Sequence, residues 1–117
     1  MLDLIPTELI AYAGESIPLM LTVTKDGNGN ALTSIEDYTV VIETRDGMKP
    51  CVAVAVDKSS DLTGDDGVLI ATNTATWMWT VAETAAFPRR IVFYVKLINS
   101  DGIASVIAFG HITVRKP

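Results

Sequence analysis

Two apolar segments near the C-terminus, joined by a turn signal, constrain the fold of this chain most. Residues 90–98 (RIVFYVKLI) and 103–114 (IASVIAFGHITV) are rich in the β-branched and aromatic residues that favour strands. Between them stands Asn99-Ser100-Asp101-Gly102, and an Asp-Gly pair between two such segments is typical of a hairpin turn. The sequence therefore predicts an antiparallel pair of long strands.

Side chains alternate along a strand, so the hairpin should present two different faces, whether its loop has four residues or its turn has two. We expect one face to be buried, because large residues on one strand lie beside smaller ones on the other. This face comprises Ile91, Phe93, Val95 and Leu97 with Ala104, Val106, Ala108 and Gly110.

The opposite face of the hairpin is too apolar to be left in water, which predicts an interaction surface there. Lys96 is expected at its rim. A second sheet layer or the N-terminal segment of the chain is the alternative cover for this face. The predicted interface residues are Val92, Tyr94, Ile107, Phe109 and His111.

Turn residues and alternating apolar residues upstream predict more strands. We expect them at about residues 8–12, 16–25, 38–45 and 51–57. Their core-facing residues are predicted to be Ile17, Leu19, Leu21 and Val23, then Tyr38, Val40 and Ile42, and then Val52, Val54 and Val56. The segment AETAAF is too short for an independent helix and predicts a single helical turn near residues 82–87, stopped by Pro88. The pattern favours an all-β fold: a two-sheet antiparallel immunoglobulin-like sandwich of about seven to eight strands.

Size and composition exclude several classes of protein. At 117 residues, 49% of them apolar, the chain is expected to form one domain over residues 1–117. A net charge of −5 argues against nucleic acid as a ligand, and no apolar run approaches the roughly 20 residues that span a bilayer. No basic or apolar signal-peptide region follows Met1, and the lone Cys51, expected to be a buried strand residue, agrees with a reducing compartment. We expect residence in the cytoplasm, or in a larger particle.

The sequence favours neither an enzyme nor a cofactor or metal site. The only histidine, His111, lies on a predicted strand, and no spacing pairs it with Ser105 or Cys51 as a catalytic dyad. No glycine-rich nucleotide loop occurs. The turn at 26–30 resembles a calcium loop but has Asp37 where the bidentate glutamate belongs. The acidic loop at 57–67 is likewise interpreted as solvated.

Trp77 and Trp79 allow two interpretations, because they share one face of a predicted strand. In a domain of this size we expect at least one ring to anchor the core. The alternative is an exposed pair that forms a platform for a carbohydrate.

Several turn and strand signals together resemble the immunoglobulin-like domain of tailed-phage tail and baseplate proteins, as at the N-terminus of the baseplate upper protein. The matching residues are Gly14-Glu15, Asp26 to Asn30, Asp37-Tyr38-Thr39, and Glu83-Thr84-Ala85 with Pro88. The chain departs from that pattern at Arg89-Arg90, where the family usually has glycine. The resemblance spans nearly the whole chain.

The resemblance implies a non-enzymatic structural module of a phage or prophage particle, in the tail or baseplate. Such a module would be located in the virion, or in the host cytoplasm before assembly. It would act as a homo-oligomer or by binding other phage structural proteins. The alternative function is a carbohydrate- or host-surface-binding β-sandwich that uses Trp77 and Trp79.

Overall fold

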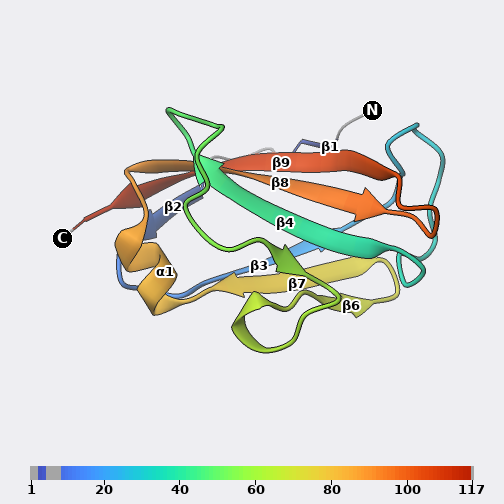
Figure 1. The fold of residues 1–117 in the computed structure, drawn as a ribbon, viewed down its shortest axis with the longest axis horizontal. Helices are drawn as coiled ribbons and strands as arrows, with labels where there is room; N and C mark the ends of the chain where they lie inside the picture. Colours follow the sequence, from blue (N-terminus) through green and yellow to red (C-terminus); the bar gives the residue numbers. More distant parts are fainter. Residues whose placement is uncertain (1–2, 5–8, 117) are drawn as a thin grey trace.

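The computed structural model describes residues 3–4 and 9–116, which form two sheets packed face to face (Figure 1). The elements in chain order are β1 (Asp3–Leu4), β2 (Leu9–Tyr12), β3 (Ile17–Thr22), β4 (Thr39–Asp46), β5 (Lys58–Ser59), the 3-10 turn η1 (Gly64–Asp66), β6 (Leu69–Ala71), β7 (Thr74–Trp79), α1 (Val81–Ala86), β8 (Arg90–Ile98) and β9 (Ala104–Arg115). The expectation of a mostly β chain with one short helical segment is confirmed.

The larger sheet is mixed, which corrects the prediction of a purely antiparallel sandwich. Its order is β1-β9-β8-β4-β5, and β2 also pairs with β9. Both β1 and β2 run parallel to β9, along the edge that β8 leaves open. The smaller sheet has the order β3-β7-β6 and is antiparallel.

The two sheets are linked along one side, so the fold curls toward a half-barrel. Ser59 of β5 forms a parallel bridge with Gly67, and the backbone N–H of Val68 donates to the Ser59 carbonyl at 3.0 Å. Residues 67–68 lead directly into β6 of the smaller sheet. The edge strand of the larger sheet is thereby connected to the smaller sheet through backbone hydrogen bonds.

The predicted C-terminal hairpin is confirmed, but its register contains a bulge. Ile98 pairs with Ala104 and Ile91 with Ile112, with a shift between Val95 and Lys96. The partners of those two residues are Ala108 and Val106, so Ile107 is the extra residue on β9. A bulge re-aims the side chain of the strand that carries it. Ile107, predicted on the interaction surface, instead lies in the core at 2% exposure.

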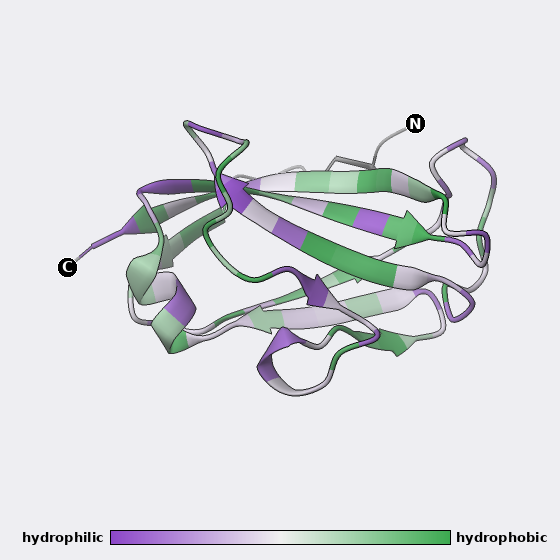
Figure 2. Cartoon of the chain, viewed as in Figure 1, coloured by the Kyte–Doolittle hydropathy of each residue, from purple (hydrophilic) through white to green (hydrophobic). Residues whose placement is uncertain are grey.

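Aromatic rings from both sheets form the centre of the core. Trp79 of β7 lies 5.2 Å from Phe93 of β8 and 6.2 Å from Phe87, measured between ring centroids, in edge-on arrangements. Its Nε1 donates to Thr44 Oγ1 at 3.0 Å, which satisfies a polar group that would be costly to bury alone. Figure 2 shows apolar stretches along the middle of β4 and β9, and polar residues at many of the loops.

Helix α1 connects the two sheets, as the sequence predicts near 82–87. Thr80 and Glu83 form a capping box, in which Thr80 Oγ1 accepts from the Glu83 N–H and Glu83 Oε1 accepts from the Thr80 N–H. Thr84 is buried and ties the helix to the turn before β3, because its hydroxyl donates to the Glu15 carbonyl at 2.8 Å. The helix is thus held at both its start and its side.

The expected strand at 51–57 is wrong. Residues 52–54 run beside the end of β4, with one isolated bridge between Arg45 and Ala53, and the pairing stops there. Val54 is half-buried against the core, but Val52 and Val56 are 44% and 65% exposed. Cys51, expected to be buried, is exposed because it lies in the turn after β4.

Candidate interaction surface

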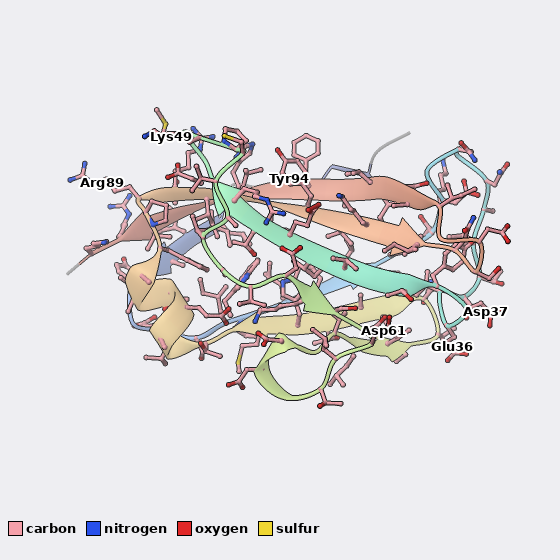
Figure 3. All side chains as sticks on the ribbon, in the orientation of Figure 1. Glu36, Asp37, Lys49, Asp61, Arg89 and Tyr94 are labelled. Atoms are coloured by element: carbon pink, nitrogen blue, oxygen red, sulfur yellow. The ribbon has the colours of Figure 1, made fainter. Side chains whose placement is uncertain are left out.

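The outer face of β8 and β9 carries a shallow hollow lined by apolar and aromatic side chains. The Tyr94 and Phe109 rings are tilted against each other at 6.5 Å between centroids, and Phe109 meets the His111 ring edge-on at 6.2 Å. Figure 3 labels Tyr94 on the side of β8 that faces away from the smaller sheet. The hollow measures about 380 Å³ and is lined by Val92, Tyr94, Val106, Phe109 and His111.

The structure brings together most of the predicted interface residues and excludes one. Tyr94, Phe109 and His111 are half-buried, so parts of all three reach solvent. Val92 lines the base of the hollow and is only 2% exposed. Ile107 does not belong to this surface, because the bulge places it in the core. Val106, which was predicted on the buried face, instead lines the hollow, because the bulge reverses the faces of β9 beyond it.

A network of ion pairs borders this hollow on the β4 side. Glu43 of β4 accepts from Arg45 at 2.6 Å and also pairs with Lys96 of β8. Arg45 pairs in turn with Asp57 at 3.1 Å. Glu43 and Arg45 are mostly shielded from water, each with 17% of its side chain exposed. Charges held in a network form a more ordered polar rim than isolated surface pairs.

The outer face of the smaller sheet also exposes apolar side chains, which the sequence analysis did not propose as a site. Met20 and Leu69 are 72% and 74% exposed and both align with Thr76, on neighbouring strands. Beside them a groove of about 420 Å³ runs between Met78 and the loop at 62–67. The alternation of residues 16–25 was the available signal, because it placed Met20 opposite the core-facing residues.

Trp77 and Trp79 lie in the core, at 3% and 0% exposure. The interpretation of a core anchor is therefore confirmed. A carbohydrate platform needs an exposed ring face. Neither ring offers one, since both pack edge-on against Phe93. These residues consequently do not form the predicted alternative site.

The turn at 26–30 uses its aspartate carboxylate within the protein. Asp26 Oδ1 accepts the backbone N–H groups of Asn28 and Asn30 at 2.9 Å each, and these bonds organise the predicted turn. Hydrogen bonding, first of all from the Asn30 N–H, lowers the pKa of Asp26 below its ordinary value. Within residues 3–4 and 9–116, no group of three or more His, Cys, Asp and Glu side chains gathers as a metal site would require.

Lys58 is the residue whose role the sequence analysis missed. It is fully buried, although the loop around it is polar. Its Nζ donates to the Asp65 carbonyl at 2.7 Å and to Glu83 Oε1 at 2.9 Å, and Asp66 lies 3.8 Å away. No sequence pattern marks this lysine, because its partners come from two separate elements. Its role is to fasten the acidic loop to α1.

No protein-family model matches the chain, and no curated protein matches it in sequence. None of the helices in the described part of the chain is long and apolar enough to cross a membrane.

Proposed function

We propose that this chain is a non-enzymatic structural module that acts through protein–protein assembly, in the tail or baseplate of a phage or prophage particle. The observation that carries the proposal is the hollow formed by Val92, Tyr94, Val106, Phe109 and His111. The sequence resemblance to tail and baseplate domains supports the assignment to a phage or prophage particle. Its site of action would be the virion, or the host cytoplasm before assembly.

The strand order supports the immunoglobulin-like part of the proposal. In a variable-type immunoglobulin domain, one sheet contains strands G, F, C and C′, and the other contains B, E and D. Here β9-β8-β4-β5 corresponds to the first order and β3-β7-β6 to the second. The parallel N-terminal strands and the curl through Ser59 and Gly67 are this chain's departures from a simple sandwich.

The hollow has the composition of a protein interface. Aromatic residues are enriched at the centre of such interfaces, and charged residues are concentrated at the rim. Tyr94 and Phe109 already contact each other, so binding would order few additional rotamers. The Lys96, Glu43 and Arg45 network supplies the polar rim. We therefore expect a second copy of the chain, or another structural protein of the particle, to cover this face.

Sedimentation of Phe109→Glu beside the parent protein tests self-association through this face. At about 1 M salt, where interactions between distant surface charges are screened, we expect the parent to associate in the micromolar range and the variant to remain monomeric with an unchanged circular dichroism spectrum. Leu69→Glu is the matched control, since it adds the same charge to an exposed apolar residue of the other sheet. The proposal is overturned if Phe109→Glu associates as the parent does, or if Leu69→Glu alone abolishes association.

A further inference from the structure

Exposed carboxylates gather at one end of the long axis of the protein. The loop at 26–30 meets the turn at 99–102 there, because both line one small pocket. Glu36 and Asp37 lie at this same end and Asp61 lies on the same half of the molecule, as Figure 3 shows, and all three are exposed. We define the acidic end by Asp26, Glu36, Asp37, Asp61 and Asp101; Lys25 is the cation beside them.

Exposed cations gather at the opposite end. Lys49 and Arg89 are labelled there in Figure 3, next to α1 and the C-terminal end of β9. The turn with Lys49 is held against the start of β8, because the Gly47 N–H donates to the Arg90 carbonyl at 2.8 Å. Carboxylates at this end include Glu15, Asp46 and, on α1, Glu83, which is paired with Lys58. We define the basic end by Lys49, Arg89, Arg90, Arg115 and Lys116, all of which are exposed.

The basic end is hollowed. A depression of about 540 Å³ is lined by Tyr12, Arg89, Thr113, Val114, Arg115 and Lys116. Arg89 and Arg115 form no ion pair with any residue in the described part of the chain. Their guanidinium groups can therefore bind carboxylates from outside, and the planar fork of arginine suits a carboxylate in two-point contact. Tyr12, half exposed beside them, offers an aromatic surface to the same partner.

We propose that the acidic end of one copy of this chain docks in the basic hollow of the next copy, in a head-to-tail contact. The two ends lie at opposite extremes of a molecule 42 Å long, so they cannot neutralise each other within one chain. A second copy of the chain carries the matching negative charge at its own acidic end, so it is the occupant that we propose for the basic hollow. Complementary charge of this kind directs encounter and fixes orientation more than it adds affinity.

This contact is separate from the β8–β9 hollow and builds on the assembly role proposed above. A head-to-tail contact joins two different surfaces, so it repeats with each added copy. It generates a ring if the rotation closes and a filament if it does not. The β8–β9 hollow and the two ends would then supply two independent directions of assembly.

Charge reversal at each end tests the proposal. Arg89→Glu with Arg115→Glu makes both ends acidic, and Glu36→Lys with Asp37→Lys and Asp101→Lys makes both ends basic. All variants are built with Phe109→Glu, so that the β8–β9 hollow does not contribute to association. Sedimentation is measured at about 10 mM and about 1 M salt, where screening lengths are about 30 Å and about 3 Å.

The Phe109→Glu protein is expected to associate at low salt and to dissociate at high salt. Each end-reversed variant alone should associate at least about tenfold more weakly at low salt, since like charges then meet. An equal mixture of the two should recover association, because an acidic end again meets a basic one. Recovery in the mixture also excludes misfolding as the cause of the loss.

Two results would overturn the head-to-tail contact. One is association of either end-reversed variant as strong as that of the Phe109→Glu protein. The other is a mixture that stays as weakly associated as its components. Neither result affects the proposed function, which depends on how the parent and Phe109→Glu compare at high salt, where the end contact is screened.

Discussion

Removing Glu83 should destabilise the protein more than removing the buried lysine that it pairs with. Lys58 has no exposed surface, and its Nζ lies 2.9 Å from Glu83 Oε1. Breaking a buried pair by deleting one partner costs about 3–5 kcal/mol, because the remaining charge stays buried and uncompensated. In Glu83→Ala the Asp65 carbonyl still accepts from Lys58, and Asp66 stays within 3.8 Å. We therefore expect the lower end of that range, about 3 kcal/mol.

The lost cap of α1 adds to this cost. Glu83 Oε1 also accepts from the Thr80 N–H at 2.9 Å, and a missing N-terminal cap costs about 1 kcal/mol. The total for Glu83→Ala is then about 4 kcal/mol. Lys58→Met behaves differently, because the Glu83 carboxylate keeps its bond to Thr80 and is 19% exposed to water. We expect Lys58→Met to cost only about 1–2 kcal/mol.

The two substitutions should also be coupled. Adding Lys58→Met to Glu83→Ala removes the stranded charge, so the double variant should be more stable than Glu83→Ala alone. Urea unfolding followed by tryptophan fluorescence measures all three variants, because Trp79 is fully buried and becomes exposed on unfolding. A Lys58→Met variant less stable than Glu83→Ala would refute the reasoning, as would a double variant that shows additive losses.

Three further predictions concern the core and the loop at 26–30. Phe93→Ala should lower the free energy of unfolding by about 3–5 kcal/mol, since the ring is fully buried beside Trp77 and Trp79; a urea-unfolding loss below about 1 kcal/mol would contradict this packing. Because the folded pKa of Asp26 is lowered, its stabilising bonds are fully present above the ordinary pKa and are lost as the pH falls through the lowered value; an NMR titration of this carboxyl that gave an ordinary or raised pKa would be the contrary result. Millimolar calcium should leave the melting temperature unchanged, because Asp26 already accepts from Asn28 and Asn30; a clear upward shift would indicate a cation site.

The alternation of side chains predicted much of the fold, because it depends on local sequence alone. Phe93, Val95 and Leu97 are buried as expected, and so are Val40 and Ile42. The bulge could not be predicted in the same way. It depends on how β8 and β9 fit each other over their full length, and one extra residue on β9 reverses the faces beyond it.

Local sequence also failed to predict burial where the packing partner of a residue comes from a distant part of the chain. The valines at 52, 54 and 56 alternate like a strand, yet the chain leaves the edge of β4 after one bridge and exposes two of them. Lys58 is the reverse case, since a lysine in a polar loop is normally solvated. Its burial depends on Glu83 in α1, and no local sequence pattern predicts a contact between residues so far apart in the chain.

The position of β9 has a consequence for synthesis. β9 is the last strand of the described chain to be made, and yet it lies between β8 and the two N-terminal strands. Leu9 of β2 pairs with Ile112, so the first strands made have no place in the sheet until the last one has left the ribosome. Such distant pairing slows folding and leaves apolar edges open meanwhile. A nascent chain of this protein therefore stays incompletely folded until β9 is released.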